Sequence, residues 1–226
     1  MQGILLVDKP AGWTSFDVVN YVRRMVATAE GKKPKNVKVG HSGTLDPFAT
    51  GLLLLLIGKD FTRRASEFSK LDKTYVLTAI LGQTSSTGDP EGEITPGSKH
   101  QPTEEAIRAK LQLLTGGISQ TPPAYSAIKV DGQRAYKLAR AGKEVVIEPR
   151  QVTIHKFELV DYQYPELKLV ADVSSGTYIR TLAEDLGRAL GTGAYTKELR
   201  RISIGKYSVR DAQEVEKLTI PLAFVE

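Results

Sequence analysis

The stretch that decides how this chain folds is VGHSGTLDPFATGLLLLLIG, residues 39–58. It joins a glycine-rich segment that contains one acid, Asp46, to five consecutive leucines at 52–56, the longest apolar run in the chain. A membrane-spanning helix needs about 20 apolar residues, so this run is too short to cross a bilayer. The stretch therefore belongs to a globular protein and leaves one question, which is what a single acid does there.

Composition supports the globular reading. The chain has 226 residues, 41% hydrophobic and 25% charged, enough for one substantial core or two small domains. No cysteine is present, which excludes disulfides, thiolate metal sites and a cysteine nucleophile and is typical of a cytoplasmic chain. The first residues, MQGILLVDKPAG, lack a basic start and meet an acid at Asp8, so they are not a secretory signal.

The basic residues gather in three clusters. The formal net charge is only +5, but residues 129–150 hold six cations against three acids. The segments 31–38 and 197–201 add two more basic clusters. Any one cluster suits a solvated surface, whereas three of them, two with tyrosines close by, favour a polyanionic partner.

Local patterns predict a mixed α+β sheet domain, because strands and helices alternate irregularly along the chain. Apolar runs, alternation, capping signals and turn residues predict strands over 3–10, 73–81, 152–163, 166–176 and 202–209, helices over 14–26, 103–117 and 179–191, a hairpin over 126–136, and a long surface loop over 83–102.

Asp46 has two readings. Asp-Pro followed by glycine describes an ordinary turn, and these eight residues alone favour that reading. The glycines Gly40, Gly43 and Gly51, however, would let another backbone or a planar ligand approach closely. His41 lies five residues before Asp46, within reach of the same pocket.

Other catalytic arrangements are excluded by their missing motifs. The three histidines, His41, His100 and His155, lack metal-ligand spacing. No nucleophile elbow, phosphate-binding loop or dinucleotide fingerprint occurs. An acid that works alone would act as a nucleophile or a base, and it would need a partner to keep it ionised.

Five segments together resemble one known family. GHSGTLDPFATGLL is similar to the catalytic motif of the TruB family of tRNA pseudouridine synthases. The family's other segments resemble, in the same order, LLVDKPAGWTSFDVV, KTYVLTAILGQTSSTGDPEG, TPPAYSAIKVDGQRAYKLARAG and SSGTYIRTLAEDLGRALGTGAYTKELRR. The resemblance runs from about residue 3 to residue 210.

The resemblance implies a fold and a reaction. The fold would be the pseudouridine synthase fold, a mixed and mostly antiparallel sheet flanked by helices, with a thumb-like RNA-binding insertion at about 119–150. The reaction would isomerise uridine to pseudouridine at position 55, in the T-arm of tRNA, without cofactor or metal. Asp46 matches the nucleophile, which attacks either C1′ of the ribose or C6 of the uracil after the base is flipped out.

The resemblance also implies supporting residues. Arg180 would pair with Asp46 and keep it ionised. His41 would stabilise the place that the flipped base leaves, and Tyr75 would stack on the extracted uracil. Further positions match substrate contacts at Tyr178 and Leu199 and a supporting residue of the active-site wall at Lys9.

The end of the chain departs from the family pattern. Bacterial members usually carry a C-terminal PUA domain, and Glu226 leaves no room for one, so we expect a short form with a single catalytic domain over 1–226. We expect a cytoplasmic monomer for which a T-stem-loop suffices as substrate. Two alternatives stay open, a non-catalytic tRNA-folding chaperone and an enzyme that modifies T-loop-like hairpins in other RNAs.

Overall fold

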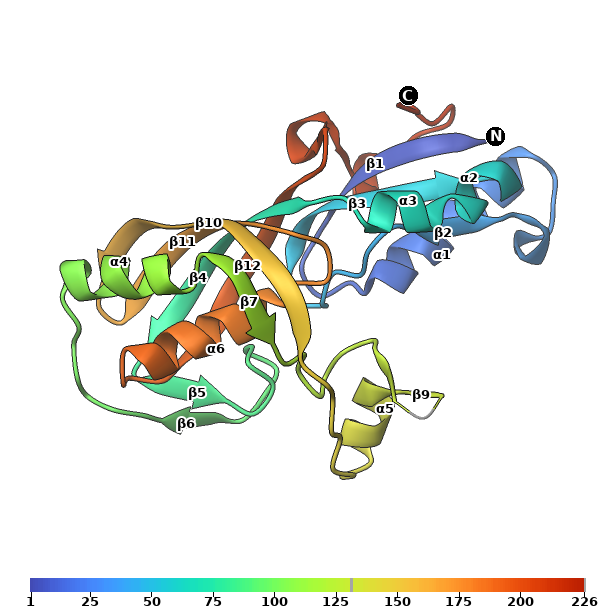
Figure 1. Ribbon diagram of the computed structural model, residues 1–226. Helices are drawn as coiled ribbons and strands as arrows, with labels where there is room; N and C mark the ends of the chain where they lie inside the picture. The colour runs from blue at the N-terminus through green and yellow to red at the C-terminus, as the bar shows by residue number, and fades with distance from the viewer. Residues whose placement is uncertain (131, 226) are drawn as a thin grey trace. The chain divides into compact units, whose positions relative to one another are not determined.

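The computed structural model describes residues 1–130 and 132–225 in two compact units (Figure 1). The first unit comprises Met1–Tyr75 with Leu199–Glu226, and the second comprises Val76–Glu198. Asp131, the first turn residue of the predicted hairpin, lies outside the described residues.

The first unit is built on a mixed sheet with the strand order β14-β1-β3-β12. Strand β1 (Gly3–Lys9) runs antiparallel to β3 (Thr50–Ile57) and parallel to β14 (Gln213–Glu214). Strand β12 (Ala194–Ile204) runs parallel to β3, while the short β2 (Val39–His41) and β13 (Tyr207–Ser208) pair antiparallel with β3 and β12.

The leucine run forms the centre of β3, and all five of its side chains are fully buried. Neighbouring residues of a strand point to opposite faces, so an uninterrupted apolar run requires a cover on both faces. Leu53 and Leu55 pack with α1 (Ser15–Ala29) in one core cluster, whereas Leu52 and Leu54 pack in a second cluster that includes Phe68 of α3 (Ala65–Ser69).

Helix α1 begins where the sequence predicts it. The Thr14 hydroxyl accepts a hydrogen bond from the Asp17 N–H at 3.1 Å, and the Asp17 carboxylate accepts one from the Thr14 N–H at 2.9 Å. This reciprocal pair satisfies backbone donors that a helix start leaves unpaired. The remaining short elements of the first unit are η1 (Pro34–Asn36), α2 (Lys59–Arg63), η2 (Val209–Asp211) and η3 (Val215–Lys217).

The second unit carries the strand order β12-β4-β11-β10-β7. Strands β10 (Arg150–Gln163), β11 (Glu166–Val173) and β7 (Gly116–Gln120) are antiparallel neighbours, as predicted for the first two. Strand β4 (Lys73–Leu81) buries the four residues predicted to share one face, Tyr75, Leu77, Ala79 and Leu81. The mixed α+β class is confirmed.

The helices of the second unit are α4 (Glu104–Leu113), α5 (Ala135–Arg140) and α6 (Ile179–Ala189). The Thr103 hydroxyl caps α4 by accepting a hydrogen bond from the Ala106 N–H at 3.2 Å. A small hairpin joins β8 (Lys129–Val130) to β9 (Gln133–Arg134), which confirms the paired strands predicted within 126–136.

Three predictions need correction. The region 83–102 is not a plain loop, because β5 (Gln83–Ser85) and β6 (Ile94–Pro96) pair within it. The predicted strand 202–209 is the end of β12 followed by β13, since Gly205 adopts φ 52° and turns the chain. The predicted helix 103–117 ends at Leu113, and its exit glycines open strand β7 instead.

Within the residues that the structure describes, no helix is long and apolar enough to span a bilayer.

Candidate active site

The predicted site residues are distributed over both units. The first unit contains Lys9, His41, Asp46, Tyr75 and Leu199, and the second contains Tyr178 and Arg180. The segment that carries Asp46, residues 42–49 between β2 and β3, is called the Asp46 loop below.

The Asp46 loop is fixed through its backbone. The Ser15 hydroxyl, at the start of α1, lies 2.8 Å from the Leu45 N–H and 3.1 Å from the Leu45 carbonyl oxygen. On the other side of Asp46, the Gly12 N–H donates to the Pro47 carbonyl at 2.8 Å. Asp46 itself closes a turn, in which its carbonyl accepts from the Ala49 N–H at 3.1 Å. These bonds hold the neighbours of Asp46 in place, so the half-buried carboxylate sits on a fixed backbone.

Lys9 is a buried lysine that binds the Asp46 loop. Its side chain is 0% exposed, and its ammonium donates to the carbonyls of Trp13 at 2.7 Å, Pro10 at 2.9 Å and Pro47 at 3.3 Å. Burial of a charge is costly unless hydrogen bonds satisfy it, and an ammonium offers three donors. Lys9 thus ties the segment after β1 to the residue that follows Asp46.

Arg201 holds the other end of the loop. This guanidinium on β12 is 1% exposed and donates from Nη2 to the Gly43 carbonyl at 3.1 Å and from Nε to the Leu52 carbonyl at 2.8 Å. Gly51, which pairs with Arg201 in the parallel ladder, adopts φ +106°. A Cβ at Gly51 would lie 2.3 Å from the Arg201 carbonyl oxygen, so only glycine fits there.

His41 lies at the entrance of the loop, where its surroundings favour the neutral ring. Burial, and then the charge of Arg201, lower the pKa of His41. The Gly43 N–H donates to Nδ1 at 3.3 Å, so the neutral ring carries its proton on Nε2. His41 therefore offers one N–H donor without adding a positive charge.

Lys73 is a second buried cation near Arg201. Its ammonium donates to the carbonyls of Leu71 at 2.5 Å and Ser69 at 3.0 Å. Burial and the Arg201 charge lower the pKa of Lys73 to about 8, while Asp72 acts in the opposite direction. Lys73 and Arg201 both lie within van der Waals distance of a Cβ placed on Gly43.

In the second unit, Arg180 is fixed by an acid that the sequence analysis assigned to a surface loop. Its Nη1 donates to the Asp89 carboxylate at 3.0 Å and to the Thr87 carbonyl at 2.7 Å, and Nη2 donates to the Tyr125 carbonyl at 2.8 Å. Arg180 and Asp89 side chains are 4% and 5% exposed. The other Asp89 oxygen accepts from the Thr87 hydroxyl at 2.6 Å and the Glu91 N–H at 3.0 Å.

Tyr178 precedes α6 and is positioned through its backbone. The buried Gln120 side chain accepts from the Tyr178 N–H at 2.8 Å and donates to its carbonyl at 3.1 Å. The other two predicted contact residues, Tyr75 and Leu199, are each 7% exposed. Tyr75 ends the first segment of the first unit, and Leu199 begins the second segment of that unit, within β12.

The predicted thumb presents its cations to solvent. The segment contains β8, β9 and α5, anchored by the buried Ala135 and Ile147. Its exposed cations are Lys129, Arg134, Lys137, Arg140, Lys143 and Arg150.

Sequence reasoning missed four buried residues that lie near predicted site residues of their own unit, namely Ser15, Lys73 and Arg201 in the first unit and Asp89 in the second. One signal was available for Asp89, because Asp89-Pro90 repeats the Asp-Pro pair of the Asp46 loop between glycines. It also missed the pair in which Arg200 donates to Asp8 at 2.6 and 3.0 Å. No local pattern marks Arg201, which is one of several cations in KELRR.

Among residues 1–130 and 132–225, no group of three or more His, Cys, Asp or Glu is arranged to hold a metal ion.

Two family models match the chain. The model described as TruB family pseudouridylate synthase (N terminal domain) covers residues 30–179, and the tRNA pseudouridylate synthase B C-terminal domain covers residues 180–224. Curated proteins called tRNA pseudouridine synthase B are similar over nearly the whole chain. The protein of Arthrobacter sp. (strain FB24) is 45% identical, with 100% of this chain and 73% of the relative covered. That of Flavobacterium johnsoniae is 44% identical, with 94% and 92% covered.

A solved structure supports the fold. A chain in the crystal structure of a Cbf5-Nop10-Gar1 complex superposes with a TM-score of 0.72 at 26% identity, over 96% of this chain and 53% of that chain. The chain spans about half the length of that solved relative. The fold and the matches define the class of protein, an α+β enzyme with the pseudouridine synthase fold. The chain belongs to the TruB family of pseudouridylate synthases and is an isomerase of tRNA uridine.

Proposed function

We propose that this enzyme isomerises the uridine at position 55 in the T-arm of tRNA, with Asp46 as the nucleophile. The observation that carries the proposal is the Asp46 loop, which matches the family's catalytic motif and whose carbonyls on both sides of the acid accept from buried donors. A reacting group held in one geometry needs little reorganisation when the substrate arrives.

The reaction conserves all atoms of the nucleotide. The N1–C1′ bond breaks, the base turns, and a C5–C1′ bond forms. The proton on C5 leaves and N1 gains one. Asp46 forms a transient bond to either C1′ or C6, and no cofactor or metal takes part in either route.

The other site residues have proposed roles in the same reaction. Flipping the base out of the T-loop costs a few kcal/mol. His41, neutral and with its donor on Nε2, would stabilise the vacated place in the loop. Tyr75 would stack on the extracted uracil, and its hydroxyl would assist removal of the C5 proton. Tyr178 and Leu199 would contact the base, and Lys9 would support the wall of the site.

Arg180 is proposed to keep Asp46 ionised. The pairing of Asp46 with Arg180 stays a prediction of the family resemblance. Within its own unit, the Asp89 carboxylate and two carbonyls already fix the Arg180 guanidinium, which would then not need to reorganise on pairing.

The thumb segment would grip the RNA through its exposed cations, because contacts with phosphates position a nucleic acid without reading its sequence. We also propose that the enzyme acts as a cytoplasmic monomer built on one catalytic domain, and that a T-stem-loop suffices as substrate.

The test is Asp46→Asn, with release of tritium from C5-labelled tRNA uridine as the measure of turnover. We expect pseudouridine formation to be abolished while tRNA binding and thermal stability persist, because the loop is held by its backbone. Asp60→Asn, at an exposed acid on α2 of the same unit, is the matched control and should keep full activity.

Turnover by the Asp46→Asn enzyme would refute the assignment of the nucleophile. The same variant distinguishes the catalytic proposal from the chaperone hypothesis. A chaperone should still promote tRNA folding after a substitution that stops the chemistry.

A further inference from the structure

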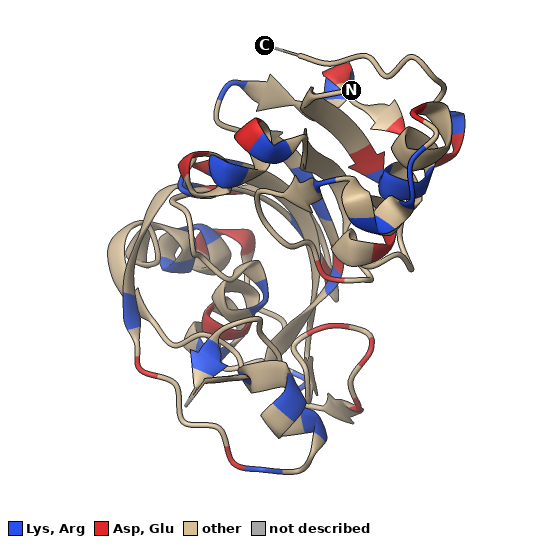
Figure 2. Ribbon diagram, turned by 90° about the vertical axis from the view of Figure 1, so that its right-hand side faces the viewer, with Lys and Arg blue, Asp and Glu red and all other residues tan. Residues whose placement is uncertain are grey.

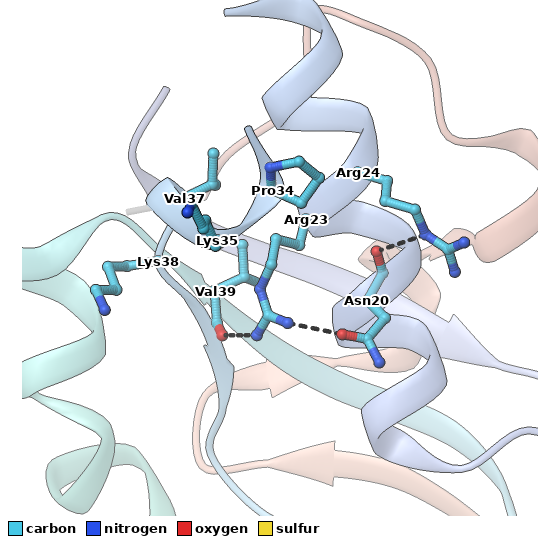
Figure 3. A pocket seen from close by; sticks show the side chains of 8 residues that line it. All are labelled: Asn20, Arg23, Arg24, Pro34, Lys35, Val37, Lys38 and Val39. Atoms are coloured by element: carbon cyan, nitrogen blue, oxygen red, sulfur yellow. Dashed lines mark hydrogen bonds between the residues drawn. The ribbon is translucent and has the colours of Figure 1, made fainter. Parts of the chain in front are cut away.

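A basic pocket lies in the first unit, outside the Asp46 loop. It has a volume of about 520 Å3 and is lined by Arg23 and Arg24 of α1 and by Lys35 and Lys38 of the segment that leads to β2. Figure 3 shows the four cations together with Asn20 and Val39, which also line the pocket. Below, "the basic pocket" means this cavity and its four cations.

The pocket lies in the segment where the charge of the chain is concentrated. Residues 20–40 contain six cations and one acid, a net charge of +5, and the whole chain also carries +5. The remaining residues therefore balance to zero. Blue and red segments are mixed over both units (Figure 2), whereas residues 20–40 carry five more cations than acids. Such a local excess attracts anions.

Among residues 1–130 and 132–225, no acid pairs with a cation of the pocket. The single acid of the segment, Glu30, pairs with the N-terminal amine and with Lys32 instead. Within the described part of the chain, none of the four pocket cations forms an ion pair, and no carboxylate lines the cavity. The pocket thus differs from an ordinary charged surface, where both signs alternate.

Arg23 is already oriented in the pocket. Its guanidinium donates from Nη1 to the Asn20 side-chain oxygen at 2.7 Å and from Nη2 to the Val39 carbonyl at 3.1 Å, as the dashed lines in Figure 3 show. Arg24 donates from Nε to the Asn20 carbonyl at 3.3 Å. A guanidinium has five N–H donors in a planar fork, so both arginines keep donors for a phosphate after these bonds are made.

We propose that the basic pocket binds backbone phosphates of the tRNA substrate. This inference rests on the proposed function and adds a phosphate contact in the first unit to the predicted contacts of the thumb. Strand β2 connects the pocket to the catalytic loop, since Lys38 precedes His41 by three residues, about 10 Å of extended chain. An RNA held at His41 therefore has its backbone within reach of the pocket cations.

The test measures how tRNA affinity depends on salt, using the full chain with Asp46→Asn so that bound tRNA is not turned over. The pocket variant combines Arg24→Gln, Lys35→Gln and Lys38→Gln. Arg23 is left intact because it also holds the Val39 carbonyl. A control variant combines Lys206→Gln, Arg210→Gln and Lys217→Gln, which removes three exposed cations of the same unit that do not line the pocket.

Each phosphate contact contributes about 0.9 to the slope of log affinity against log salt. Three lost contacts should reduce the slope of the pocket variant by about 2.7. Between 50 and 200 mM salt, the drop in affinity should then be roughly 40-fold smaller for the pocket variant than for the parent. The control variant should change the slope by less than about one contact. Equal melting temperatures for the two triple variants will show that both are folded.

An unchanged slope in the pocket variant, or equal changes in both triple variants, would overturn the proposal. Titration with inorganic phosphate distinguishes a site for the free ion, because phosphate binding without a change in the tRNA slope would also overturn it. Failure of the proposed function would be seen separately, as absence of pseudouridine formation by the unmodified enzyme.

Discussion

Each unit contains an Asp-Pro turn fastened by a buried arginine, but the two arginines bind different parts of their turns. Arg201 reaches the Asp46 loop through the carbonyls of Gly43 and Leu52. Arg180 binds the carboxylate of Asp89 itself, together with the Thr87 carbonyl. The first loop keeps its shape through backbone contacts, whereas the second depends on its acid side chain.

This difference bears on function. The printed bonds that hold the Asp46 loop are made by backbone groups, so substitution of Asp46 leaves these bonds in place. Asp89, nearly buried and accepting three hydrogen bonds, is part of the structure that fixes Arg180.

Removal of Arg180 should have the largest effect on stability. Arg180→Met leaves the Asp89 carboxylate buried without its cation, which costs about 3–5 kcal/mol of unfolding free energy. Urea denaturation measures the loss. Adding Asp89→Asn to Arg180→Met should recover part of it, because the buried charge is then gone. A double variant less stable than Arg180→Met would contradict the pairing.

Gly51→Ala should lower the free energy of unfolding, because its side chain would overlap the backbone of Arg201. The new Cβ meets the Arg201 carbonyl oxygen at 2.3 Å in a residue with φ +106°, so we expect a loss of about 3 kcal/mol from strain and overlap together. Gly142→Ala is the matched control, since Gly142 has φ +68° but no atom within 4 Å of its Cβ. Strain alone there should cost about 1–2 kcal/mol. Equal losses in the two variants would show that the close approach of β12 is unimportant.

Arg201→Met should cost less than Arg180→Met, because it leaves no buried carboxylate unpaired. The carbonyls of Gly43 and Leu52 lose a charged donor, for a loss of about 2 kcal/mol. The Asp46 loop loses one anchor, so turnover should fall more than tRNA binding does. A loss of stability as large as that of Arg180→Met would remove the distinction between the two arginines.

The smallest expected effect is the contribution of Lys73 to the pH dependence of the unfolding free energy. Its pKa is about 8 in the fold, against 10.5 as its ordinary value, so above pH 8 the folded protein releases a proton that the unfolded chain retains. Stability from this group therefore rises with pH, by about 1 kcal/mol between pH 8 and 9. Denaturation at the two pH values should show this gain in the parent and not in Lys73→Met.

Arg201→Met sharpens the same measurement. Because the Arg201 charge helps to lower the pKa of Lys73, its removal should shift the gain to higher pH. A pH profile that is identical in the parent and both variants would contradict the proposed coupling of the two buried cations.

The local elements and the likeness to the TruB family could be predicted from the sequence alone. Alternation in 73–81, the Thr14–Asp17 capping box and the five leucines at 52–56 depend on neighbours a few residues away, so they can be recognised without a fold. The segments that resemble the TruB family in the same order along the chain were also sufficient to predict the family. The family model and the similar proteins confirm this prediction.

The partners of the buried charges, in contrast, became visible only in the folded chain. Arg201 lies 158 residues from Gly43, and Arg180 lies 91 residues from Asp89. Nothing in the neighbourhood of either arginine indicates such a partner, because a buried cation is stabilised by whichever carbonyls and carboxylates the fold brings to it. The same holds for the leucine run, whose two buried faces are covered by α1 and by α3, elements on opposite sides of it in the chain.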